Sequence, residues 1–130
     1  MNVKNLFTAT AIINSLFGIL LIFAPTMMTQ EYLTNSSLEN DATVFLGRLL
    51  GSVLISIGIA GWIARNTGPS IARRALLILT SIGSLGNCII HIIAITGNVE
   101  KSFAWGTVLL AIILTIWGGQ LLMKEKDTIN

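Results

Sequence analysis

Four long apolar runs separated by short polar segments make up most of the 130-residue chain. The runs cover residues 6–24, 43–64, 75–96 and 103–123. At about 1.5 Å per helical residue, each run measures about 30 Å as a helix, which is the thickness of the hydrocarbon layer of a membrane. The pattern therefore predicts an all-α fold, an integral membrane four-helix bundle that forms a single transmembrane domain over residues 1–130.

The composition agrees with a membrane protein. Hydrophobic residues make up 53% of the chain and charged residues only 11%, whereas soluble proteins have about 25% charged residues. The basic residues do not form a run with interleaved aromatic residues, so a nucleic-acid partner is not expected. The expected partners are membrane lipids.

The basic residues gather on one side of the predicted spans. Those that flank this side are Lys4, Arg65, Arg73, Arg74, Lys124 and Lys126, whereas the other side has only Lys101 beyond the span ends. Loops rich in lysine and arginine stay in the cytoplasm during insertion. We therefore expect both the N and C termini to be cytoplasmic and the connection of residues 25–42 to be an outer loop.

The connection of residues 25–42 begins at Pro25, which is expected to end the first helix because proline cannot donate the backbone hydrogen bond. The residues that follow predict a short amphipathic or interfacial turn. Tyr32 is expected to anchor this turn at the membrane surface.

The run of residues 75–96 carries a polar seam made of Thr80, Ser84, Asn87 and His91. At 100° per residue these side chains fall within about a 60° arc of one helix face. Isoleucine and leucine side chains occupy the opposite arc, so one face suits lipid and the other protein. His91 is the only histidine in the chain, and an ionisable group within a membrane span is a functional candidate by default.

The run of residues 43–64 is rich in small residues, which allow close helix packing in lipid. The residues assigned to packing are Gly47, Gly51, Ser52 and Gly58. Gly47 and Gly51 form a GxxxG motif, whose partner is either another helix of the same chain or a second protomer. A homo-oligomer and a larger membrane complex therefore both remain open.

Arg48 lies about one turn below the outer end of its predicted span. Two interpretations are open: an anchor that reaches the membrane surface and pairs with Glu39 or Asp41, or a charge held in an outward-facing pocket. Threading the four spans up and down places the candidate ligand-binding residues in one half of the bundle: Arg48, His91, Asn87, Ser84 and Thr107. A guanidinium and an imidazole suit a carboxylate, a phosphate or a lipid headgroup.

The alternative for His91, Asn87 and Ser84 is a structural role, in which they hydrogen-bond to one another or to backbone carbonyls across helices.

Catalysis is not expected. The predicted spans contain no Asp or Glu to act as a general acid or base, and no serine lies in a nucleophile motif. Cys88 is the only cysteine, so neither a disulfide within one chain nor a metal site of the Cys/His type is expected. We expect no enzyme activity, no metal and no cofactor.

A resemblance to a known family rests on the segment 45–51 (FLGRLLG), Gly61-Trp62, Arg73-Arg74, the pair Asn87 and His91, and Trp105-Gly106. With these residues the chain resembles small bacterial four-span membrane proteins of uncharacterised function, the DoxX-like and related domain-of-unknown-function families. The resemblance covers residues 43–123. It implies a four-helix bundle in the inner membrane, and it does not indicate a reaction or a ligand.

The sequence therefore predicts a non-catalytic integral membrane binding or accessory protein that holds a lipid-like or anionic amphiphilic ligand in an outer-leaflet pocket. The alternative is a homo-oligomeric channel or small-solute transporter packed through the second span. A subunit of a larger membrane complex is a third possibility.

Overall fold

The structure is a computed structural model that describes residues 2–129, apart from the side chains of residues 36 and 126–129. Its elements in chain order are α1 (Val3–Phe23), α2 (Pro25–Tyr32), the 3-10 turn η1 (Ser36–Leu38), α3 (Asp41–Ala64), α4 (Ile71–Thr96), the 3-10 turn η2 (Ser102–Ala104) and α5 (Trp105–Ile129). The four long helices are each long and apolar enough to cross a membrane. The predicted all-α four-helix fold is confirmed, and the protein is a multi-pass membrane protein. The side chain of Lys126, counted above among the flanking charges, lies outside the described part.

Polar residues at the helix starts explain where the long helices begin. The side chain of Asn2 accepts a hydrogen bond from the backbone N–H of Lys4 at the start of α1. Asn40 and Thr43 form a reciprocal capping box at the start of α3, which satisfies backbone donors that have no partner within the helix. As expected from the sequence, α1 ends just before Pro25, which is the first residue of α2.

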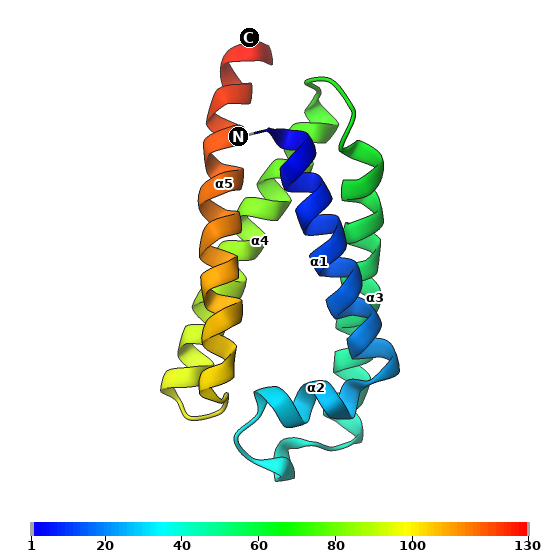
Figure 1. The fold of residues 1–130 in the computed structure, drawn as a ribbon, viewed down its shortest axis with the longest axis vertical. Coiled ribbons are helices and arrows are strands. Elements are labelled where there is room, and N and C mark those ends of the chain that lie inside the picture. The colour runs from blue at the N-terminus through cyan, green and yellow to red at the C-terminus, as the bar shows by residue number, and fades with distance from the viewer. Residues whose placement is uncertain (1, 130) are drawn as a thin grey trace.

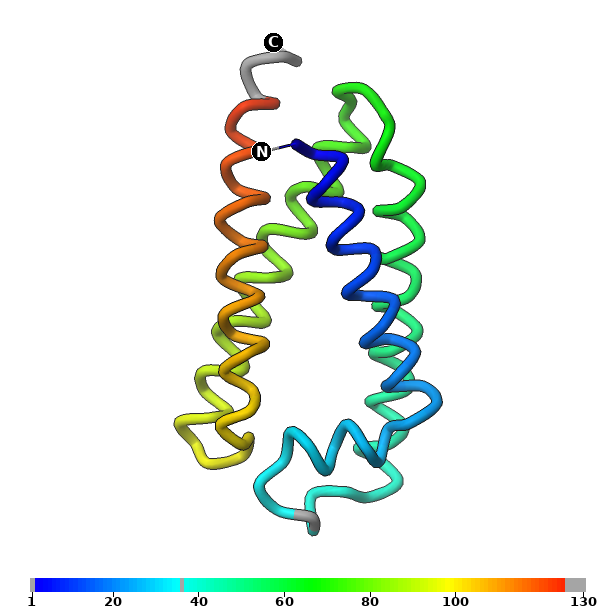
Figure 2. The backbone as a smooth tube through the Cα atoms, viewed as in Figure 1, coloured from blue at the N-terminus to red at the C-terminus, as the bar shows by residue number. Residues whose placement is uncertain are grey.

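The long helices associate in two pairs, as Figure 1 shows. One pair is α1 with α3 and the other is α4 with α5. The backbone trace in Figure 2 shows that the pairs converge at the end of the bundle where both chain ends lie. They diverge toward the opposite end, where α2 crosses between them. We call these two ends the terminal end and the α2 end.

The apolar core that both pairs share lies in the terminal half of the bundle. Its buried members come from all four long helices and are Leu6, Phe7, Ala64, Leu77, Leu114 and Leu121. A second cluster of Cys88, Val108 and Ala111 belongs to α4 and α5 alone. Toward the α2 end, each pair is therefore packed mainly within itself.

Close backbone contact joins α1 to α3. A Cβ atom placed on Gly51 would lie 2.7 Å from the carbonyl oxygen of Gly18, and one placed on Gly58 would lie 2.6 Å from the hydroxyl of Ser15. Gly47 is less crowded, since its Cβ would meet only the Leu21 side chain at 3.8 Å. Ser52 is exposed. The glycine face of α3 therefore packs against a helix of the same chain.

A buried ion pair links α4 to α5 at the terminal end. The Arg73 guanidinium contacts the Glu125 carboxylate and also donates to the backbone carbonyl of Thr67. The Arg73 side chain is only 13% exposed. Arg73 is thus more than a flanking surface charge, because it also ties the loop after α3 to the last turns of α5.

Candidate functional site

The short connection between α4 and α5 folds back along α4. Asn98 has a positive φ of 57°, a conformation that asparagine tolerates better than most residues. The turn lets the backbone N–H groups of Val99 and Glu100 both donate to the carbonyl of Ala94, at 2.8 and 3.1 Å. This geometry brings the Glu100 side chain beside the last turns of α4.

Glu100 and His91 form a direct contact in this position. The Nδ1 atom of His91 lies 2.7 Å from Oε2 of Glu100, and the two side chains are 16% and 14% exposed. An ionised carboxylate can only accept hydrogen bonds, so Nδ1 carries the proton and donates. The structure gives Nε2 of His91 no partner among the described residues. The hydrogen bond of Nδ1 therefore fixes the orientation of the imidazole, and Nε2 can bond to another group.

Tyr32, the last residue of α2, joins this contact to α5. Its hydroxyl lies 2.7 Å from the hydroxyl of Thr107. Its ring centroid is 6.0 Å from that of His91 and 5.5 Å from that of Phe103, in an edge-on arrangement with Phe103. We call Tyr32, His91, Glu100, Phe103 and Thr107 the α2-end cluster.

Backbone hydrogen bonds fasten α2 to the connection between α4 and α5. Leu33 and Glu100 form an isolated antiparallel bridge. The N–H of Lys101 donates to the carbonyl of Tyr32 at 2.7 Å, and the N–H of Thr34 donates to the carbonyl of Val99 at 3.0 Å. At the α2 end, the two helix pairs are thus held together chiefly through polar contacts made by α2 and the residues just after it.

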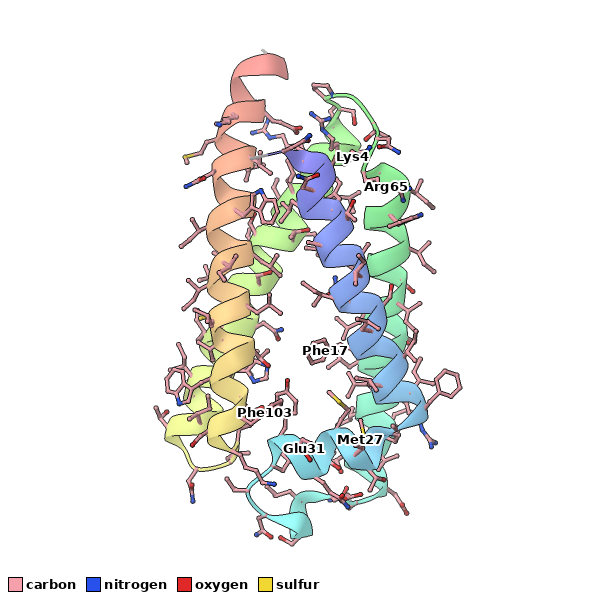
Figure 3. All side chains as sticks on the ribbon, in the orientation of Figure 1. Lys4, Phe17, Met27, Glu31, Arg65 and Phe103 are labelled. Atoms are coloured by element: carbon pink, nitrogen blue, oxygen red, sulfur yellow. The ribbon has the colours of Figure 1, made fainter. Side chains whose placement is uncertain are left out.

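Apolar side chains between the pairs are only partly covered toward the α2 end. Figure 3 shows Phe17 projecting from α1 into the space between the two pairs, above α2. Phe17 is half-buried, as are Ile13 on α1 and Leu110 on α5, which pack against the edge of the shared core. Part of the surface of each of these side chains is exposed and can contact an apolar group.

Two of the predicted binding residues meet in the α2-end cluster, since Tyr32 contacts both His91 and Thr107. Asn87 is exposed and Ser84 is half-buried. In the described part of the chain neither side chain has a hydrogen-bond partner. The structural alternative, in which His91, Asn87 and Ser84 bond to one another, is not what the structure shows.

Arg48 is not joined to the α2-end cluster. Its side chain is exposed on α3, which packs against α1. No hydrogen bond or ion pair links it to His91, Glu39, Asp41 or any other described residue. The sequence suggested a shared pocket because Arg48 and His91 were expected at similar depths, but depth alone does not determine which way a helix is rotated.

Sequence reasoning missed Glu100 and Tyr32 as members of the site. The sequence predicted only an anchor at the membrane surface for Tyr32; in the structure its half-buried ring lies against His91 and Phe103. A signal was present for Glu100, because the connection is short and contains Asn98, a residue that favours tight turns. For Tyr32, the contact with Thr107 spans 75 residues, and no local pattern reveals it.

The described residues contain no group of three or more His, Cys, Asp or Glu side chains that could hold a metal ion. Cys88 is buried in the contact between α4 and α5, and its thiol makes no hydrogen bond to His91. Comparison of the chain with protein-family models, with curated proteins and with solved structures found no match. The resemblance to DoxX-like proteins therefore stays a prediction.

Proposed function

We propose that the protein is a non-catalytic membrane protein that binds one lipid-like molecule between its two helix pairs at the α2 end. The observation that carries this proposal is the division of the bundle. The core common to both pairs lies in the terminal half, whereas the α2 end carries polar groups of α2, α4 and α5 beside half-buried apolar side chains.

The α2-end cluster supplies the polar contacts. The hydroxyls of Tyr32 and Thr107 can each donate or accept, and Nε2 of His91 accepts when the imidazole is neutral. The Glu100 carboxylate beside His91 makes an anion a poorer fit than the sequence suggested, because Arg48 is not there to balance the charge. The favoured polar end is a neutral group that can both donate and accept hydrogen bonds, such as a hydroxyl or an amide.

The half-buried side chains of Ile13, Phe17 and Leu110 supply the apolar contacts. Each contact between apolar atoms is weak, but a chain of methylene groups makes many of them. A lipid tail laid along these side chains would complete packing that the two helix pairs leave partial. The class of ligand is therefore an amphiphile with one apolar tail placed inside the bundle.

The charges at the two ends support the expected orientation in a bacterial inner membrane. Lys4 and Arg65 lie at the terminal end, and Glu31 lies at the α2 end, as Figure 3 shows. Because cytoplasmic ends of spans are rich in lysine and arginine, we propose that both termini are cytoplasmic. The α2-end cluster then lies in the outer leaflet.

Native mass spectrometry of the full chain released from mild detergent tests this function. We expect one retained lipid-like mass per protomer, which is lost in the double variant Tyr32→Phe and Thr107→Val. The matched control is Ser52→Ala with Ser56→Ala, which also removes two hydroxyls, but from an exposed face of α3. A bare wild-type protomer, or a ligand that survives the Tyr32 and Thr107 changes, would contradict the proposal.

The same spectrum addresses the alternative of a homo-oligomeric channel. The glycine face of α3 is covered by α1, so an oligomer packed through the second span would use another face of α3, and Ser52 and Ser56 lie on an exposed one. Both hydroxyls donate to carbonyls of their own helix, at 2.8 and 2.9 Å, and can still accept from a second protomer. A closed oligomer without a retained ligand would favour the channel.

A further inference from the structure

A cavity lies at the α2 end, apart from the α2-end cluster. It has a volume of about 330 Å³, at the small end of the range for ligand pockets. No member of the α2-end cluster lines it. Its polar lining residues are Thr29, Gln30, Thr34, Asn35, Glu39 and Lys101.

Two opposite charges face this cavity without pairing. Lys101 and Glu39 both line it, yet no salt bridge joins them, and the carboxylate of half-buried Glu39 has no partner in the described part of the chain. The Lys101 ammonium donates to the carbonyl of Gln30. An ammonium has three donors, so two remain for a ligand.

The other polar groups add both donors and acceptors. The hydroxyl of Thr29 donates to the carbonyl of Thr26, and that of Thr34 donates to the carbonyl of Asn98. Each hydroxyl oxygen can therefore still accept. The Oδ1 atom of Asn35 accepts from the N–H of Ser37, which leaves its amide N–H groups to donate. The cavity can thus bind a cationic and an anionic group together.

We propose that this cavity binds a compact zwitterion, with its ammonium at Glu39 and its phosphate at Lys101. The phosphoethanolamine group has this chemistry. Glu39 lies just before α3 begins at Asp41, and Lys101 lies just before the last membrane helix, so both charges sit where lipid headgroups meet the spans. A trimethylated ammonium lacks the N–H donors that the carboxylate requires, so the site discriminates against choline.

Native mass spectrometry of the detergent-solubilised full chain, titrated with short-chain lipids, tests the proposal. We expect phosphatidylethanolamine to bind more tightly than phosphatidylcholine or phosphatidylglycerol, by about tenfold or more. The reason is that one hydrogen bond to a charged group changes a dissociation constant by about this factor. Glu39→Gln should abolish this preference. Lys101→Gln should weaken binding of all three lipids, since each carries a phosphate, whereas Lys101→Arg should retain most of the affinity. The matched control is Glu31→Gln, since Glu31 is an exposed carboxylate on α2 that does not line the cavity.

Free O-phosphoethanolamine distinguishes the source of the zwitterion. If it competes with the lipid, the site also takes the soluble compound; if only the lipid binds, the site takes a membrane headgroup. Equal binding of the three lipids without binding of O-phosphoethanolamine would overturn the proposal. So would a preference that survives Glu39→Gln, or lipid binding that Lys101→Gln leaves unchanged.

This site does not depend on the proposed function. The Tyr32→Phe and Thr107→Val variant removes no side chain that lines the cavity. Looser backbone at Thr34 and Lys101 lowers the affinity for the three lipids together, so the preference for phosphatidylethanolamine should persist. The experiments therefore distinguish failure of the zwitterion site from failure of the proposed ligand site between the helix pairs.

Discussion

The two ends of the bundle hold the helix pairs together by different physical means. At the terminal end, buried side chains such as Leu6, Phe7 and Leu77 form one core from all four long helices. At the α2 end, the pairs are linked through hydrogen bonds of Tyr32, Thr34 and Lys101. Burial that joins the two pairs is therefore concentrated at the terminal end, whereas the links at the α2 end are mainly polar.

The comparison also shows why the polar residues lie where they do. A buried polar group that lacks a partner is costly, and at the α2 end His91, Glu100, Tyr32 and Thr107 satisfy one another in pairs. Nε2 of His91 keeps its capacity to form a further hydrogen bond, which a ligand can use. Four substitutions test this difference between the two ends.

The largest effect is expected in the terminal core. Phe7 is 1% exposed, so Phe7→Ala should lower the free energy of unfolding by about 3 to 5 kcal/mol. The measurement is unfolding by SDS titration in mixed micelles. Phe23→Ala is the control, since Phe23 is 79% exposed and faces away from the core. Equal losses in the two variants would contradict a core at the terminal end.

A smaller loss is expected where α1 meets α3. Gly51→Leu places side-chain atoms against the backbone of Gly18 and should cost about 1 to 3 kcal/mol. The same SDS titration measures it. At Gly83 an added Cβ would meet nothing within 4 Å, so Gly83→Ala should not destabilise the protein. If both variants behave alike, close packing of α1 on α3 is wrong.

At the α2 end we expect a modest and local effect. Tyr32→Phe removes the hydrogen bond to Thr107 and should cost about 0.5 to 1.5 kcal/mol. Hydrogen exchange should speed up at the backbone N–H groups of Thr34 and Lys101 but not in the terminal half of α1. Ser56→Ala is the control for loss of a hydroxyl. Faster exchange throughout the protein would show that the α2 end also carries global stability.

The smallest effect is expected on the orientation of His91. Because His91 is the only histidine, a ¹⁵N NMR spectrum of histidine-labelled protein reports on this ring alone. We expect Nδ1 to be protonated in the wild-type protein, and the protonated fraction to fall in Glu100→Ala. Glu31→Ala should leave the spectrum unchanged. An Nδ1 atom without a proton in the wild type would contradict the bond to Glu100.

Much of the fold could be predicted from the sequence, because the length and apolar character of a span are local properties. Periodicity also identified an apolar outward face on α4, since Ile82, Ile89 and Ile93, on the arc opposite the polar seam, are exposed. Among the predicted site residues, His91 and Thr107 come together through Tyr32.

The rest of the site depends on how separate helices are rotated and spaced, which no single helix encodes. The sequence grouped Arg48 with His91 because their depths agree, yet α3 presents Arg48 to the surroundings. The fold of the connection after α4 decides that Glu100 reaches His91, and α2 decides that Tyr32 reaches Thr107. The first contact depends on the turn that follows α4, and the second arises only when the two pairs assemble.

Distances between spin labels in nanodiscs test whether the pairs, which share a core at the terminal end, hold the proposed lipid-like ligand at the α2 end. One label pair at the exposed positions Leu46 and Leu109 reports on the α2 end, and one at Ile63 and Met123 reports on the terminal end. We predict that removal of the retained ligand shifts or broadens the distance distribution between the first pair and leaves the second unchanged. Identical distributions with and without ligand at both ends, or equal changes at both, would contradict the account.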